Sequence, residues 1–141
     1  MTDLVAGVLQ LTTEGARAVL SAAVRDAEAD AAAVSIAVVD AGGHVLVLER
    51  LPGAAAHTVH SATTKAACAA SMRKATGLAG SPIDVPTGLG IALAAGPERW
   101  TPLPGGFPLV VDGQCVGAIG VAGAPHDVDE RVARAGTAAL G

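Results

Sequence analysis

The chain has 141 residues, enough for one domain spanning residues 1–141 that buries about two thirds of its unfolded surface without disulfides or metal. It is 51% hydrophobic but has no Tyr, one Trp and one Phe, so the core is made from small and aliphatic side chains and no aromatic platform for stacking bases exists. Nine basic against thirteen acidic residues give a net charge of -4 without a basic cluster, so nucleic acid is not an expected partner.

Compartment is indicated by the cysteines and by the apolar segments. Cys68 and Cys115 follow no metal-binding spacing and lie in apolar sequence, which favours reduced core thiols over a disulfide. The N-terminus lacks the pattern of a secretory leader. The most apolar window, residues 31–48, is interrupted by Asp40, Gly42 and His44 and cannot span a bilayer. The sequence therefore predicts a cytoplasmic protein with no membrane partner.

The first half of the chain predicts a helix followed by a hairpin. Apolar residues recur at helical spacing from about residue 12 to residue 30, with Thr12 or Thr13 placed to cap the helix. Two apolar runs, 34–39 and 45–48, then flank a turn at residues 40–43 and predict two strands.

The middle of the chain predicts an alanine-rich helix from about residue 58 to residue 74, whose small side chains permit close packing on a sheet. Glycine and proline punctuate residues 75–97, which we interpret as a mobile or substrate-facing loop with a short helix at 90–95. Residues 99–101 are expected to form a short strand.

A second hairpin is predicted where runs 107–111 and 115–121 flank Asp112-Gly113, a pair typical of tight turns with φ > 0. Glycines at 117, 120 and 123 indicate either close helix packing or a ligand lying on bare backbone. Residues 127–140 predict a last helix with acidic residues in its first turn. The expected fold class is α+β, with about five mostly antiparallel strands covered by helices.

Common catalytic and nucleotide-binding motifs are absent. The sequence has no complete dinucleotide fingerprint, phosphate loop, Gly-x-Ser-x-Gly, His-Glu-x-x-His or Cys-x-x-Cys-His. What remains is a polar stripe on the alanine helix, with His57, Ser61, Lys65 and Cys68 on one face and His60 beside them. The histidines are either solvent-exposed or able to ligate a metal or haem iron and transfer protons. Lys65 is placed to hold an anionic ligand or to pair with Glu49.

Six short motifs, in order from residue 11 to residue 140, resemble the series found in the GlcG/HbpS family of haem-binding-type proteins, which includes the C-terminal domain of PduO-like proteins. They occupy residues 38–43, 50–54, 65–69, 105–108, 112–113 and 116–123. The resemblance implies a profilin-like five-stranded antiparallel sheet between helices and a homo-oligomer. It also implies a site near Arg50, Lys65 and Gly105-Gly106. Asp129 occupies the family's acidic position at the start of the last helix, and the alternative role for this residue is to cap that helix or to pair with its dipole. Pro52, Cys68 and Ala122 depart from the family pattern.

Three functions stay open. A small-ligand-binding protein of haem or tetrapyrrole type would use His57 or His60 as an axial ligand and pair Arg50 and Lys65 with the propionates, although few aromatic side chains are available to contact a macrocycle. No other metal site is expected.

A cofactor-independent isomerase, cyclase or lyase would instead hold a small anionic or carbonyl-containing metabolite on Arg50 and Lys65. Amides at Gly105 and Gly106 would bind an oxyanion, and His57, His60, Glu49 or Lys65 would act in catalysis. A non-catalytic structural or regulatory oligomer is the third possibility. The resemblance favours haem. The site hypotheses built on Arg50 and Lys65 require both side chains to converge on the Gly105-Gly106 bend.

Overall fold

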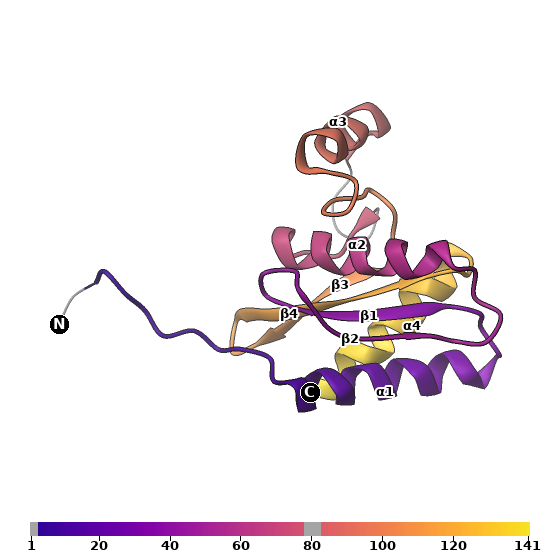
Figure 1. Cartoon of the computed structure of the whole chain (residues 1–141). Coiled ribbons are helices and arrows are strands. Elements are labelled where there is room, and N and C mark those ends of the chain that lie inside the picture. The colour runs from indigo at the N-terminus through magenta and orange to yellow at the C-terminus, as the bar shows by residue number, and fades with distance from the viewer. Residues whose placement is uncertain (1–2, 78–82) are drawn as a thin grey trace.

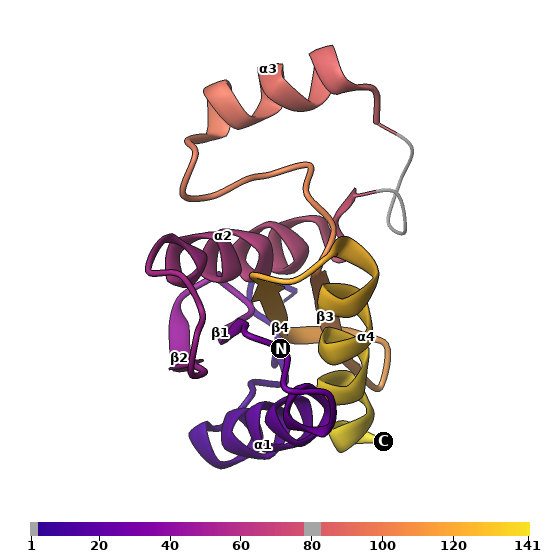
Figure 2. The same cartoon turned by 90° about the vertical axis from the view of Figure 1, so that its right-hand side faces the viewer.

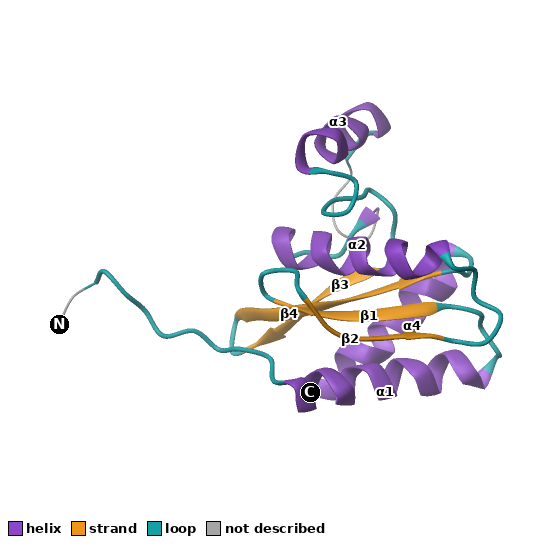
Figure 3. Ribbon diagram, in the orientation of Figure 1, coloured by secondary structure: helices purple, strands orange, loops and turns teal. Residues whose placement is uncertain are grey.

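The computed structural model describes residues 3–77 and 83–141. Figures 1 and 3 show the helices and strands along the chain. Their order is α1 (Thr13–Ala29), β1 (Ser35–Asp40), β2 (Val45–Arg50), α2 (His57–Met72), α3 (Val85–Ala95), β3 (Gly106–Val111), β4 (Gln114–Ala122), α4 (His126–Thr137) and the short 3-10 helix η2 (Ala138–Leu140).

One antiparallel sheet with the strand order β2-β1-β4-β3 organises the described residues. The expected α+β class, with an antiparallel sheet flanked by helices, is confirmed. The expectation of five strands is wrong, because the described residues form four. Residues 99–101 are not a strand: the amides of Arg99 and Trp100 both donate to the carbonyl of Gly96 and form a turn after α3. The likeness to profilin and the single-domain organisation stay predictions.

The helices cover the two faces of the sheet unequally. Figure 2 shows α2 on one face and α1 with α4 on the other. On the α1 and α4 face, larger side chains such as Ile36, Val38 and Ile119 form the main core. On the α2 face, the core is made mostly of alanines from α2 and the sheet. The alanine-rich helix therefore lies closer to its sheet than a leucine-rich helix would.

Gly120 shows how close that approach is. A Cβ atom added there would collide with the carbonyl of Ala62 and the amide of Ala66, both on the α2 backbone. Of the two explanations for the spaced glycines, close helix packing is the one seen at Gly120. The β4 backbone at this position is covered by α2 rather than open to a ligand.

Local sequence signals place the main elements where expected. The Oγ1 atom of Thr12 accepts from the amide of Gly15 at 3.0 Å and caps α1. Asp112 and Gly113 both have positive φ, at 50° and 74°, as the predicted hairpin turn requires. The last helix is α4, extended by η2. Within the described residues, no helix combines the length and the apolarity that crossing a membrane would require.

Residues 83–104, which we call the arm, comprise the outlying helix α3 and the segment after it, which returns to contact α2 at Thr64 and Cys68. Figures 1 and 2 show α3 beyond α2, with the chain from residue 96 onward running back between them. The helix begins earlier than the predicted residue 90, because Asp84 accepts a hydrogen bond from the amide of Thr87 at 2.8 Å and caps it. Residues 78–82, which are part of the predicted loop, lie outside the described residues.

Candidate functional site

A buried ion pair joins the middle of α2 to the first turn of α4. The Nζ atom of Lys65 lies 3.1 Å from Oδ2 of Asp129 and donates to the carbonyl of Val121 at 2.9 Å. The second carboxylate oxygen of Asp129 accepts from the amide of Ala124 at 3.0 Å. Both side chains are buried, at 4% and 2% exposed. The Lys65 ammonium, which was expected to hold an anionic ligand, is therefore bound by groups of the protein itself.

Burial raises the pKa of the Asp129 carboxyl, whereas the charge of Lys65 and the Ala124 hydrogen bond act to lower it. A buried charge without a partner is costly, and each of these two groups compensates the charge of the other. The arrangement ties α2 to the start of α4. The structure thus gives Asp129 more than the capping role considered from the sequence, since it pairs with a lysine from another helix.

The Gly105-Gly106 bend packs directly against this pair. Gly105 has φ of 123°, and a Cβ atom there would lie 2.6 Å from the carbonyl oxygen of Val121 and 3.1 Å from Nζ of Lys65. The amide of Gly106 donates to Oγ1 of Thr76 at 2.9 Å. Lys65 reaches the bend, which is one half of the predicted convergence of Lys65 and Arg50. Their contact is closed packing, and the Gly106 amide is already bonded, so it is not an open oxyanion-binding group.

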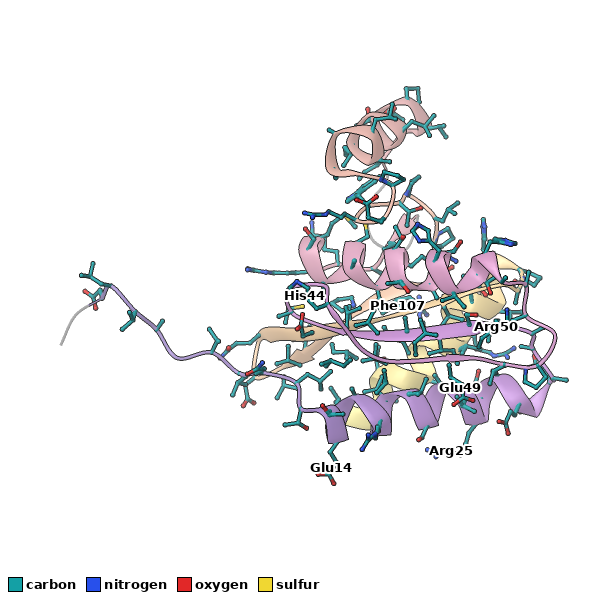
Figure 4. All side chains as sticks on the ribbon, in the orientation of Figure 1. Glu14, Arg25, His44, Glu49, Arg50 and Phe107 are labelled. Atoms are coloured by element: carbon teal, nitrogen blue, oxygen red, sulfur yellow. The ribbon has the colours of Figure 1, made fainter. Side chains whose placement is uncertain are left out.

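Glu49 and Arg50, which end β2, lie on opposite faces of the sheet. Arg50 pairs with Ser35, whose hydroxyl contacts that of Thr58 at 2.9 Å at the start of α2. Glu49 pairs with Ile36, a residue of the core on the α1 face, and Figure 4 shows Glu49 on that side. Both side chains are exposed. Glu49 is therefore separated by the sheet from Lys65 and α2.

His57 and His60 are exposed on the first turn of α2. At a rise of about 1.5 Å per residue, His57 is roughly 22 Å along the helix axis from Met72 at its other end. The structure thus brings together Lys65, Asp129, Gly105 and Gly106, but leaves both histidines on the surface and Arg50 at the exposed end of β2.

An apolar cavity of about 480 Å³ lies between the arm and the body. We call it the arm cavity. Its wall includes the end of α2, the start of α3, the connection to β3 and the start of α4, with the side chains of Met72, Ile83, Val85, Leu89, Trp100 and Leu103. Of the four histidines in the chain, His126 is the one in this lining among the described residues. Trp100 is 7% exposed and supplies an aromatic ring to the cavity.

Sequence reasoning missed the arm cavity because its residues come from segments that no periodic pattern links. The one Trp in the chain and a histidine directly before the acidic turn of α4 were the available signals. Cys68, beside the cavity wall, donates from Sγ to the carbonyl of Thr101 at 3.4 Å, and burial raises the pKa of its thiol. Among the described residues, no group of three or more His, Cys, Asp or Glu side chains is placed to hold a metal ion.

Comparison with known proteins places the chain among relatives that share its fold. Residues 11–138 match a family described as "HbpS-like: Haem degrading protein HbpS-like". The chain is 38% identical over 111 residues to Protein GlcG of Escherichia coli strain K12, covering 79% of this chain and 80% of that protein.

Two solved structures resemble the chain over 93% or more of its length. A double mutant of Streptomyces reticuli HbpS superposes with a TM-score of 0.80 at 38% identity, covering 100% of this chain and 94% of that one. A complex of PduOC with haem superposes with a TM-score of 0.82 at 27% identity, covering 93% and 95% of the two chains.

Proposed function

The chain belongs to the HbpS-like family, and from that membership we propose that it binds haem or a similar tetrapyrrole in the arm cavity. The observation that carries the proposal is the cavity itself. Its volume of about 480 Å³ lies within the roughly 300–1,000 Å³ typical of small-molecule sites, and its lining is mainly apolar. The relative PduOC, which shares the fold, was solved with haem.

The residues of the cavity fit a haem group chemically. His126 and Met72 carry the imidazole and thioether groups that commonly ligate haem iron, and both line the cavity. Trp100 offers an apolar aromatic surface to a macrocycle. Haem bound there would supply an iron whose redox behaviour is set by these ligands and by burial.

We propose that His126 takes the axial role first considered for His57 and His60, because it lines the cavity and they do not. For the propionates, the exposed cations Arg73 and Lys74 follow Met72 directly. Lys65 is less suited, since its ammonium already pairs with Asp129. Arg50 lies at the opposite end of α2 from Met72.

Titration of the purified apoprotein with haemin tests the proposal. We expect a saturable Soret shift at one haem per chain. Leu103→Glu places a charge in the cavity wall and is expected to weaken binding at least tenfold, whereas Val110→Glu, at an exposed position of β3 outside the lining, leaves it unchanged. A titration that does not saturate would contradict haem binding. Equal haemin affinity of the two variants would contradict the arm cavity as the binding site. Haem degradation would appear as a loss of Soret absorbance with time.

A further inference from the structure

A hollow of about 460 Å³, distinct from the arm cavity, lies where the β1–β2 turn, α2 and the arm meet. We call it the polar hollow. Its volume is within the roughly 300–1,000 Å³ of small-molecule sites. Unlike the mainly apolar arm cavity, it brings acidic, basic, imidazole and hydroxyl side chains together. The lining includes His44 from the turn, Ala67 and Ser71 from α2, and Glu98, Arg99 and Trp100 from the arm.

The arm side of the polar hollow is bonded to α2 at two points. The hydroxyl of Thr64 donates to the carbonyl of Pro97, and the thiol of Cys68 donates to the carbonyl of Thr101, each at 3.4 Å. Trp100, which lies between these two anchors, is 7% exposed. The two charged residues of the lining come from the same anchored stretch. Their backbone is therefore held in place before any ligand arrives.

The charges of Glu98 and Arg99 are not neutralised by an ion pair within residues 3–77 and 83–141. Both side chains are exposed. A Cβ atom on Gly96 would lie 2.8 Å from Oε1 of Glu98, so this carboxylate folds back over the glycine that ends α3. An acidic and a basic group of the same hollow are thus both available to a ligand.

His44 adds an imidazole whose orientation is set by its neighbours. Its Nδ1 atom lies 3.3 Å from Oδ1 of Asp40. The ring covers Gly42, where an added Cβ atom would lie 3.0 Å from Nδ1. Nε2 is therefore the ring nitrogen left to a ligand. With the hydroxyl of Ser71, which can donate and accept, it supplies uncharged hydrogen bonds beside the two charges.

We infer that the polar hollow binds a small zwitterion, a molecule that carries one ammonium and one carboxylate group. A simple carboxylate is attracted by Arg99 and repelled by Glu98, and a simple ammonium ion meets the reverse. A zwitterion pairs with both charges, while Trp100 and Ala67 contact its carbon chain. This binding does not depend on haem.

Titration calorimetry of the purified protein without haemin tests the site with glycine, β-alanine and γ-aminobutyrate, three zwitterions of increasing length. We expect at least one of them to bind saturably, at one molecule per chain, and to change the fluorescence of Trp100, the one tryptophan in the chain. The alkanoate and the alkylammonium ion with the same carbon chain should each bind about fivefold more weakly, near the upper range for an exposed ion pair.

Two variants separate the two charges. Glu98→Gln should lower the affinity for the zwitterion to about that for the alkanoate, and Arg99→Gln should lower it to about that for the alkylammonium ion. Arg25→Gln and Glu28→Gln remove matched exposed charges from α1, on the other face of the sheet, and should leave the affinity unchanged.

No saturable binding of any of the three zwitterions would overturn the site. Equal affinity for the zwitterion and the alkanoate would overturn the recognition of both charges. Wild-type affinity in Glu98→Gln or Arg99→Gln, or a loss in either α1 variant, would overturn the polar hollow as the place of binding. Each of these results is independent of the haemin titration, which tests the arm cavity alone.

Discussion

The ammonium of Lys65 lies 3.1 Å from the carboxylate of Asp129, and neither side chain is more than 4% exposed. Breaking such a pair from one side leaves an uncompensated buried charge. We therefore expect Lys65→Met to lower the free energy of unfolding by about 3–5 kcal/mol at neutral pH, measured by chemical denaturation. Lys74→Met, which removes an exposed lysine, should change it by no more than about 0.5 kcal/mol. Equal effects of the two variants would contradict a structural role for Lys65.

The same pair predicts a pH dependence with a defined sign. Burial raises the pKa of Asp129 above its ordinary value of 3.8, so the folded state holds this proton more tightly than the unfolded state. Its contribution to stability is therefore present below pH 3.8 and lost as the pH rises through the folded-state pKa. Lys65 is one of the groups that lower this pKa, so Lys65→Met raises it further.

Consequently, the stability lost by Lys65→Met relative to wild type should be larger at pH 8 than at pH 5, because lowering the pH favours protonation of Asp129, which removes the unpaired charge. Denaturation curves of both proteins at the two pH values measure this. In the Lys65→Met/Asp129→Asn double variant, which has no carboxyl to titrate, the difference between the two pH values should shrink. A loss that is the same at both pH values in the single variant would refute the coupling.

Gly120 is expected to tolerate no side chain. In Gly120→Ala, the added methyl group meets the α2 backbone at Ala62 and Ala66, which cannot yield as a side chain could. We expect a loss of about 3 kcal/mol or more, at the upper end of overpacking effects. Gly90→Ala is the control: it adds the same methyl group where no atom lies within 4 Å and should be neutral or stabilising. Thermal or chemical unfolding compares them, and a mild effect at Gly120 would contradict the close approach of α2.

Arg73 ends α2 in a left-handed conformation with φ of 57°, which a side chain disfavours. Arg73→Gly is expected to stabilise the apoprotein by about 1 kcal/mol, because glycine adopts this conformation without the steric cost. If Arg73 also contacts a propionate, the same variant should bind haemin more weakly. A destabilised apoprotein would show that the Arg73 side chain contributes contacts that outweigh the backbone strain.

Elements with a local signal could be predicted from the sequence. Thr12 caps α1 and Asp112-Gly113 turns the second hairpin, because each feature depends on residues close together in the chain. The strand expected at residues 99–101 was wrong, since its amides turn back on Gly96 after a helix that the sequence placed too late.

Part of the candidate site could likewise be predicted from the sequence, and part could not. The convergence of Lys65 with the Gly105-Gly106 bend was predicted, but its neutralisation by Asp129, 64 residues away, left no local pattern. That Glu49 and Arg50 point to opposite faces follows from the alternation of side chains along any strand, but which of them faces α2 depends on the pairing of β1 with β2, which a strand pattern alone does not specify. The arm cavity joins Met72, Trp100 and His126 across three segments, so no motif contains it.

We propose that His126, which lines the arm cavity, ligates haem iron. The most direct measurement is the absorption spectrum of the haemin complex of His126→Ala beside those of His57→Ala and His60→Ala. We predict that His126→Ala loses the ligand-specific Soret position and at least tenfold in affinity, while the two α2 variants keep the wild-type spectrum. An unchanged spectrum for His126→Ala, or its loss in either α2 variant instead, would contradict the account.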